Sequence, residues 1–419
     1  MRFSVGINYW PRRSAMAMWQ RFAASEVRED FARIADLGLD AVRFFLRWAD
    51  FQPERERIDT SMLDRLVAVV ECAADAGIRV MPTLFCGHMS GVNWLPSWTL
   101  DRSVPHGRFR TITEEGESPY GAGDIYTGRL LDAQLKLARA AGERLNGHPA
   151  VLAWDLGNEF SNVRIPASEA DATNWSRRLT DALQESSAHP VCAGTHGEDL
   201  TQDRALRLAS LDAPHAFATM HGYPVYSWFS RSRSDPEVVP FLAQLAAAFS
   251  FKPVLFSEFG NPTCPPGKLS PYDRVPLPDE PPAPTISPDD PVLAPYACLD
   301  EHEMATYATA VLDRLHADGR LGAYWWCWAD YADELHDEAP FDRAIHERSF
   351  GIIRSDGTEK PVAHALSAFA KEHRTVGRPM EMPMIADVYY YRTLPTSTKT
   401  LYDAFLGVVE ERRTAAGYR

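Results

Sequence analysis

Short apolar runs alternate with amphipathic segments along most of the chain. Each run is rich in Val, Ile, Phe or Trp, which is typical of parallel strands buried on both faces. The segments between them repeat their apolar positions at helical spacing. The predicted strands are 3–10, 41–48, 78–85, 151–159, 190–196, 216–223, 253–259 and 321–328.

Helix signals fall between the predicted strands. Ser25 is expected to cap a helix that runs to about Leu37 and ends at Gly38. Thr60 or Ser61 is expected to start the next helix, which Gly77 ends. Further signals are the segment 130–145, Ser168 with Asp171, Asp300 with Glu303, and Pro361.

Eight strands alternating with helices predict an α/β protein, a (β/α)8 TIM barrel, over residues 1–374. Two long segments follow the third and seventh strands, at about 86–127 and 261–299. Both leave the carboxyl ends of strands, where barrel active sites lie, so they are expected to wall a cleft. A disordered surface loop is the alternative for the proline-rich second one. The tail, 375–419, is expected to pack on the barrel as an appendage or, alternatively, to form a homodimer contact.

Composition argues against two kinds of partner. The formal net charge of −14 disfavours nucleic acid, because its binders need clustered positive charge. No run of about 18 apolar residues exists, which disfavours a membrane span. The opening MRFSVGINYWP lacks the basic and apolar regions of a signal peptide, so a cytoplasmic location is expected.

The cysteines point to neither a metal nor a cofactor. None forms a C-x-x-C pair, and no cluster of His and Cys has zinc spacing. Scattered cysteines with apolar neighbours fit a reducing compartment and ordinary packing. They are Cys72, Cys86, Cys192, Cys264, Cys298 and Cys327.

Two predicted strands each end in a carboxylate. WDLGNEF ends the fourth strand with Asn158 and Glu159, and PVLFSEFG ends the seventh with Glu258. Either one alone is also consistent with a strand end that meets solvent or an arginine. Because the two strands lie across the mouth of a barrel, the carboxylates are expected to face each other over one bound sugar. A facing pair is the basic machinery for glycoside hydrolysis.

The motifs in barrel order resemble glycoside hydrolase clan A, and most of all family 5. That resemblance covers about residues 3–374 and implies that Glu159 is the general acid/base and Glu258 the nucleophile of a retaining enzyme. It also implies a sugar site made by the residues that match the family motifs. These are Arg43 in VRFFLRW, His88 in FCGHMSG, Asn158, His221 and Tyr223 in HGY, and Trp326 in YWWCWADY.

The chemistry of each role fits its residue type. Glu258 must be ionised to attack, and a neighbouring Arg43 favours the charge. Glu159 must begin protonated, which the charge of Glu258 favours. Trp326 offers a flat apolar face to a sugar ring. Trp10, Trp94, Trp98 and Asn162 are further candidates for substrate binding, while Asp330 either contacts substrate or caps a turn.

The substrate is expected to be an oligosaccharide or glycoside. The stretches GINYWP and GHMSGVNWLPSW resemble family members that act on β-mannosides, and long loops favour a closed pocket. An exo-acting β-mannosidase is therefore the leading hypothesis. The alternatives are an endo-β-1,4-mannanase or endoglucanase, a β-glucosidase or β-galactosidase, a transglycosylase, and an inactive carbohydrate-binding barrel.

Overall fold

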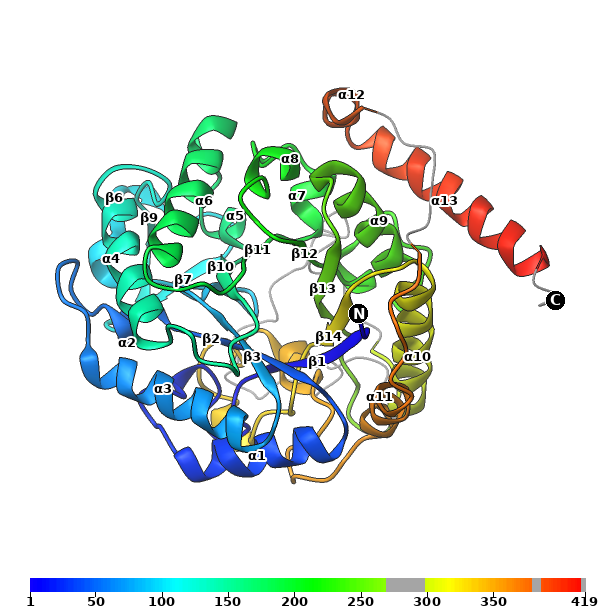
Figure 1. The fold of residues 1–419 in the computed structure, drawn as a ribbon, viewed down its shortest axis with the longest axis horizontal. Helices are drawn as coiled ribbons and strands as arrows, with labels where there is room; N and C mark the ends of the chain where they lie inside the picture. The colour runs from blue at the N-terminus through cyan, green and yellow to red at the C-terminus, as the bar shows by residue number, and fades with distance from the viewer. Residues whose placement is uncertain (269–297, 379–385, 416–419) are drawn as a thin grey trace, which may run out of the picture.

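The computed structural model describes residues 1–268, 298–378 and 386–415, and within them eight parallel strands form a ring (Figure 1). Neighbouring strands pair in chain order, and β14 pairs with β1. A bridge between His196 and His221 closes the ring from β11 to β12. The strands are β1 Ser4–Tyr9, β2 Ala41–Phe45, β3 Arg79–Thr83, β10 Trp154–Asn158, β11 Val191–Gly194, β12 Ala218–His221, β13 Val254–Phe259 and β14 Gly322–Trp325. The predicted TIM barrel is confirmed.

Helices surround the ring, as Figure 1 shows. One predicted helix start is corrected and another is confirmed. The first helix has Ala23 rather than Ser25 at its N-cap. The second begins at Thr60, as predicted, and is capped by Asp59, whose side chain accepts from the Ser61 and Met62 amides. The long helices are α1 Ala24–Asp36, α3 Thr60–Asp75, α4 Gly128–Arg144, α6 Glu169–Gln184, α9 Val238–Ser250, α10 Glu301–Ala317 and α11 Pro361–Lys371. Short helices are α2 Trp48–Phe51, α5 Phe160–Val163, α7 Gly197–Thr201 and α8 Leu208–Leu211.

Side chains fill the barrel interior, so no channel runs through it. A buried cluster takes one residue from or beside most strands, and it is separate from the larger apolar layer under the helices. Its members are Ala41, Met81, Ala153, Cys192, Leu255 and Tyr324. A ligand site must therefore lie at an end of the barrel.

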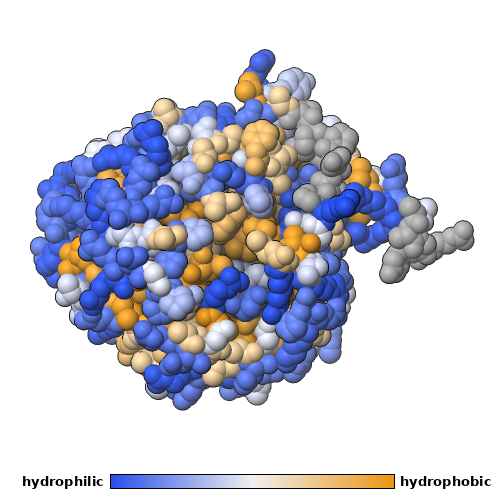
Figure 2. All heavy atoms as spheres, in the orientation of Figure 1, coloured by the Kyte–Doolittle hydropathy of each residue, from blue (hydrophilic) through white to orange (hydrophobic). Residues whose placement is uncertain are grey.

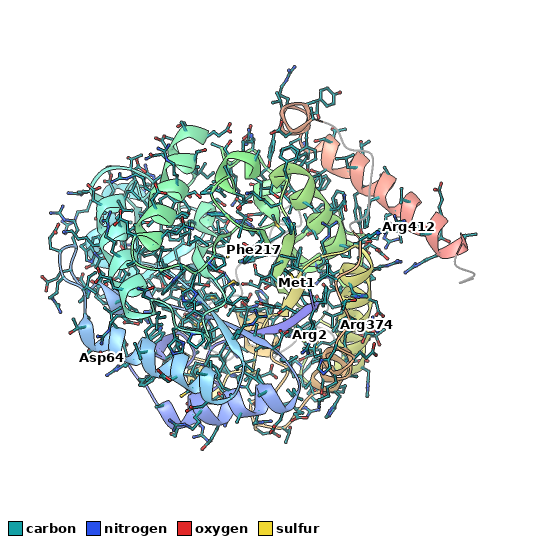
Figure 3. The ribbon with its side chains drawn as sticks, viewed as in Figure 1. Met1, Arg2, Asp64, Phe217, Arg374 and Arg412 are labelled. Carbon is teal, nitrogen blue, oxygen red and sulfur yellow. A yellow bond between two sulfur atoms is a disulfide. The ribbon has the colours of Figure 1, made fainter. Side chains whose placement is uncertain are left out.

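The view in Figures 1 to 3 is onto the amino end of the strands. Met1 and Arg2, which precede β1, and Phe217, which precedes β12, lie near the middle of this face in Figure 3. Apolar side chains gather near the middle of the same face in Figure 2, while its rim is mostly hydrophilic. The carboxyl ends of the strands are on the opposite face.

The long segment after β3 forms its own small β-structure. Its first strand, β4, pairs with β10 at Gly87 and Asn158, so this insertion extends the barrel wall beyond the carboxyl ends. The strands are β4 Gly87–Met89, β5 Val92–Trp94, β6 Leu100–Pro105, β7 Arg110–Thr113, β8 Gly116–Ser118 and β9 Tyr120–Ala122.

The described ends of the proline-rich segment are held together. Thr263 bridges to Leu299, and Cys264 forms a disulfide with Cys298. The expectation that all six cysteines serve ordinary packing was therefore wrong for these two, because the fold brings together residues that are 34 positions apart. The prediction that 261–299 walls the cleft falls mostly outside the described residues.

The C-terminal residues form α12 Asp387–Arg392 and α13 Thr396–Ala415, which contact the barrel helices (Figure 1). The Tyr391 hydroxyl donates to the Asp199 carbonyl at 3.2 Å, and the Tyr402 hydroxyl donates to Asp235 at 2.7 Å. A division of the chain at 374/375 stays a prediction. Among the described residues, no helix combines the length and apolarity that crossing a membrane requires.

Candidate active site

A pocket of about 620 Å³ lies at the carboxyl ends of the barrel strands. Most of the predicted site residues line it, although they come from five different strand ends or the loops that follow them. Those lining residues are His88, Asn158, Glu159, His221, Tyr223, Glu258 and Trp326.

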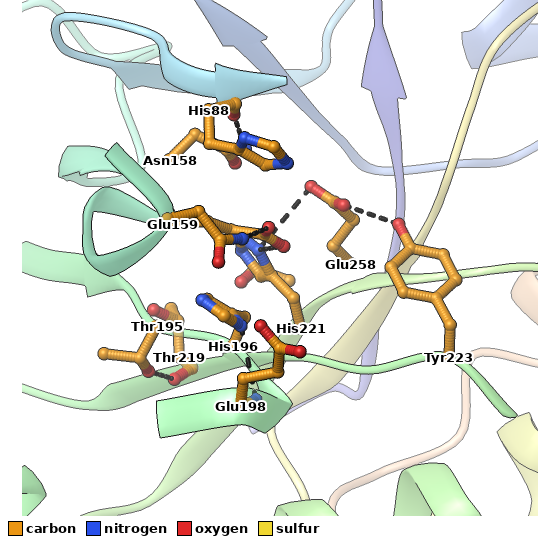
Figure 4. A network of polar contacts seen from close by, with 12 residues as sticks. His88, Asn158, Glu159, Thr195, His196, Glu198, Thr219, His221, Tyr223 and Glu258 are labelled. Atoms are coloured by element: carbon orange, nitrogen blue, oxygen red, sulfur yellow. Dashed lines mark hydrogen bonds and ion pairs between the residues drawn. The ribbon is translucent and has the colours of Figure 1, made fainter. Parts of the chain in front are cut away.

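Glu258 is held from both sides. Arg43 Nη1 donates to Glu258 Oε2 at 2.9 Å. The Tyr223 hydroxyl donates to Oε1 at 2.5 Å, as Figure 4 shows. Burial and then the charge of Glu258 raise the pKa of Tyr223 well above its usual value, so its hydroxyl keeps its proton and remains a donor. These contacts hold the Glu258 carboxyl group in one orientation.

Arg43 lies beneath the pocket and is fully buried. Its guanidinium also donates to Asn8, to Asn158 Oδ1 at 2.7 Å and to Asp155 at 2.6 Å. Burial acts to lower the pKa of Arg43, but the negative charges of Asp155 and Glu258 have the larger effect, and the pKa of Arg43 is raised. One cation therefore orients the candidate nucleophile and the neighbouring amide together.

Glu159 adopts a left-handed backbone conformation, with φ of 50°, at the turn from β10 into α5. Its Oε1 lies 3.1 Å from His221 Nδ1, and its Oε2 accepts from Asn162 Nδ2 at 3.1 Å. A carboxylate oxygen of Glu159 and one of Glu258 lie within 4.8 Å of each other. Retaining glycosidases have carboxyl groups about 5–5.5 Å apart, whereas inverting ones need about 6.5–9.5 Å. The spacing fits retention.

Two pocket histidines are held neutral by burial. Desolvation lowers the pKa of His221 to about 3 and that of His88 to about 4. His88 Nδ1 lies 2.8 Å from Asn93 Oδ1, which fixes the ring orientation. Neutral rings act as hydrogen-bonding groups and add no charge beside the glutamates.

Glu159, His221 and Glu258 also lie near enough together to share a metal ion. The surroundings argue against that use, because Arg43 already places a positive charge on Glu258 and Tyr223 engages its other oxygen. A cation there would compete with both contacts.

Trp10 and Trp94 were also predicted to bind substrate, but both lie outside the pocket lining. Trp10 is fully buried and stacks on Phe45, with ring centroids 5.3 Å apart. Trp94 is 5% exposed, and its indole donates to the Met89 carbonyl. Both are corrected to packing residues, since neighbouring rings and backbone cover them.

Three further predictions are resolved by contacts. Trp98 packs against Trp48 and donates to the Gln52 carbonyl, outside the lining. Asp330 accepts from Lys360 Nζ at 2.8 Å and from the Gly351 amide, so it stabilises a turn. Asn162 does line the pocket, beside Glu159.

Sequence reasoning missed a polar cluster beside Glu159. Arg204 donates through Nη1 to Asn162 Oδ1 at 2.7 Å and pairs through Nη2 with Glu198. His196 also lines the pocket. Burial acts to raise the pKa of Glu198, but Arg204, His196 and Arg108 bring it down to about 2. The one signal for this cluster is the polar THGE that follows the fifth strand.

Glu347 was also missed. It lines the pocket from the segment after β14, only 6% exposed. No apolar strand ends at Glu347, so the hydrophobic pattern carries no signal for it.

The insertion after β3 reaches across the pocket to two other segments. Arg108 pairs with Glu198 of α7 at 2.9 Å, and Arg110 pairs with Asp342 after β14. Lower down, Ser90 donates to Glu347 at 3.0 Å. These contacts join walls that arise far apart in the sequence.

A family model described as beta-galactosidase (glycoside hydrolase family 42) matches residues 17–186. That stretch contains Arg43, Asn158 and Glu159, and the barrel supplies Glu258 opposite them. This part of the chain is therefore similar to clan A glycoside hydrolases. No curated protein matches this chain by sequence.

Solved structures share its fold. An exo-beta-1,4-mannosidase from Opitutaceae bacterium strain TAV5 is 24% identical, with a TM-score of 0.71 over 89% of this chain; the chain spans 60% of that protein. GH5_18 from Streptomyces cattleya, in complex with GlcNAc, is 22% identical, with a TM-score of 0.75 over 100% of this chain and 92% of that one. GH5_18 from Bifidobacterium longum subsp. longum is 19% identical, with a TM-score of 0.70 over 91% of this chain and 81% of that one. The barrel is thus similar to those of family 5.

Proposed function

We propose that this protein is a glycosidase, specifically an exo-acting β-mannosidase that works with retention of configuration. The observation that carries the proposal is the pair Glu159 and Glu258, with carboxylate oxygens within 4.8 Å and different surroundings. Glu258 is held by a cation, whereas the described partners of Glu159 are an amide and a neutral imidazole.

In the first step, a Glu258 oxygen attacks the anomeric carbon as the bond to the leaving oxygen breaks. Glu159 gives its proton to that oxygen, and a covalent glycosyl-enzyme forms. The ester has no charge on Glu258, so the site now favours an ionised Glu159. In the second step Glu159 takes a proton from water, the water oxygen attacks the same carbon, and Glu258 leaves as a carboxylate.

Three residues are placed to hold the terminal sugar. Asn158 Nδ2 donates one hydrogen to the His88 carbonyl at 2.5 Å, which leaves its second hydrogen for a sugar hydroxyl. Trp326 directly follows β14 and lines the pocket, so its aromatic face can stack on the sugar ring. His88 offers a neutral ring nitrogen for another hydroxyl.

The ion pairs that join opposite walls of the pocket support exo action. The ion pairs of Arg108 with Glu198 and of Arg110 with Asp342 carry the insertion over the pocket, where a polymer would have to pass. A pocket of about 620 Å³ has room for a short oligosaccharide.

The β-mannoside assignment rests on resemblance at low identity. One similar structure is named an exo-beta-1,4-mannosidase, and a variant of the Streptomyces cattleya protein was solved in complex with Manβ1-4GlcNAc. Manβ1-4GlcNAc is therefore the natural first substrate to test. The family model described as beta-galactosidase makes a β-galactoside the second candidate.

Hydrolysis of 4-nitrophenyl β-mannoside, β-glucoside and β-galactoside, of Manβ1-4GlcNAc and of polymeric mannan tests the proposal. We expect release of mannose from the aryl mannoside and the disaccharide, with little from mannan. A preference for the galactoside, or activity on mannan without activity on the aryl mannoside, would overturn it. Product analysis at high acceptor concentration separates hydrolysis from transglycosylation.

A further inference from the structure

Glu347 differs from the other pocket carboxyl groups in the side chains that donate hydrogen bonds to it. It lies in the 3-10 helix η5 Ile345–Ser349, and its side chain is 8% exposed. Oε1 accepts from the Tyr226 hydroxyl at 2.8 Å, while Oε2 accepts from Ser90 at 3.0 Å and from the Trp326 indole at 3.4 Å. It therefore touches the platform expected to carry the sugar ring and the insertion that walls the pocket.

Among the described residues, no Lys or Arg pairs with Glu347. Arg43 forms an ion pair with Glu258, and Arg204 forms one with Glu198. The basic side chain nearest to Glu347 is His346, at 3.5 Å, and burial lowers the pKa of that imidazole to about 3. Glu347 is thus a buried carboxyl group without a cation in its described surroundings.

This environment favours the protonated form. Burial first, and then the charge of Glu258, raise the pKa of Glu347 to about 7, against the hydrogen bonds of its neighbours. The surrounding phenols and thiol supply no charge, because burial raises their pKa values. These groups are Tyr223, Cys327 and Tyr331.

We propose that Glu347 binds a hydroxyl of the terminal sugar, remote from the anomeric carbon, and so selects which sugar the pocket accepts. Its carboxyl group lines the pocket beside Trp326 and donates a hydrogen bond to the hydroxyl oxygen. A carboxylic acid offers both a donor and an acceptor, which suits a sugar hydroxyl. A site built to pair with a hydroxyl strongly rejects a sugar that lacks it. The inference rests on the glycosidase function proposed above.

The test compares Glu347→Ala and Glu347→Gln with the parent enzyme on an aryl β-mannoside and on its 3-deoxy, 4-deoxy and 6-deoxy analogues. For the parent we expect kcat/KM to fall by about 10- to 100-fold on one analogue. Glu347→Ala should show the same fall in kcat/KM on the complete sugar. On that analogue, its kcat/KM should equal that of the parent. An equal loss on every sugar would contradict the proposal, since a structural role would act on all of them.

Ser90→Ala and Tyr226→Phe are matched controls, because each removes one hydrogen bond to Glu347 and leaves its carboxyl group. They should keep the discrimination between sugars. If they abolish it as Glu347→Ala does, the loop contact rather than the carboxyl group selects the sugar.

Glu347→Gln keeps the shape of the side chain and covers the case in which the alanine variant fails to fold. For the parent we expect KM to rise as the pH passes about 7 and the donor proton is lost, and we expect no such rise for Glu347→Gln. The same rise in both would overturn the proposal. The glucoside and galactoside assays keep the two hypotheses apart: if another sugar is preferred, its deoxy analogues test Glu347 equally well.

Discussion

Glu159 and Glu258 approach each other to within 4.8 Å across the barrel mouth, although they are 99 positions apart in the sequence. His221 lies between them, with Nδ1 3.1 Å from Glu159 and 3.7 Å from Glu258 (Figure 4). Arg43 binds only Glu258 of the pair. This asymmetry separates the roles of the two carboxyl groups.

Removing Glu258 and removing Glu159 should change the kinetics in different ways. Glu258→Ala should lower kcat by about 1,000-fold or more, because the covalent step is lost. Azide should restore turnover of an activated aryl glycoside and give the α-glycosyl azide, since it attacks from the side vacated by the carboxylate. Glu159→Ala should instead keep much of its first step on substrates whose leaving group needs no proton. Stopped assays with product NMR measure both.

Glu143→Ala, on the exposed face of α4, is the matched control and should behave like the parent. A β-glycosyl azide from Glu258→Ala, or undiminished hydrolysis by it, would reverse or refute the assignment.

Loss of the buried cation should affect stability and activity together. Arg43→Met leaves Asp155 and Glu258 buried without their partner, so we expect a loss of about 3–5 kcal/mol in the free energy of unfolding. Arg43→Lys keeps the charge but not the planar fork that reaches four side chains. It should recover part of the stability and little of the kcat. Urea titrations and initial rates decide this; full activity in Arg43→Lys would contradict the positioning role.

Asn162 should matter through Glu159. Its amide accepts from Arg204 and donates to Glu159 Oε2, which fixes the carboxyl orientation. Asn162→Ala should lower kcat about 10-fold on substrates with poor leaving groups and much less on activated ones. Asn146→Ala, an exposed site after α4, is the control. Equal losses on both substrate types would show that Asn162 does not act on proton transfer.

Glu347 should also make folding stability depend on pH. Its pKa is about 7 in the folded state against an ordinary value of 4.5, so the folded chain holds a proton that the unfolded chain releases. The contribution of this proton to the free energy of unfolding is complete below pH 4.5 and is lost as the pH rises through 7. Between pH 5 and pH 8, the parent should therefore lose about 2 kcal/mol more stability than Glu347→Gln. Denaturant titrations at both pH values measure the difference, and parallel curves would contradict it.

Strand-end residues were the most predictable part of the site. Glu159, Asn158 and Glu258 end apolar runs, and parallel strands of a barrel bring their carboxyl ends to one rim. The sequence pattern therefore sufficed to place them together. Trp10 also ends an apolar run, yet it is fully buried, because its orientation depends on Phe45 beside it.

The sequence by itself determined the barrel, since eight apolar runs separated by amphipathic helices leave few other ways to bury both faces of each strand. It also determined the two facing glutamates. Only the tertiary structure decided the cluster of Arg204, Asn162 and Glu198, the disulfide of Cys264 with Cys298, and the place of Glu347. These residues lie in loops, where no periodic pattern operates, and their burial and charge depend on side chains that the fold brings from distant segments.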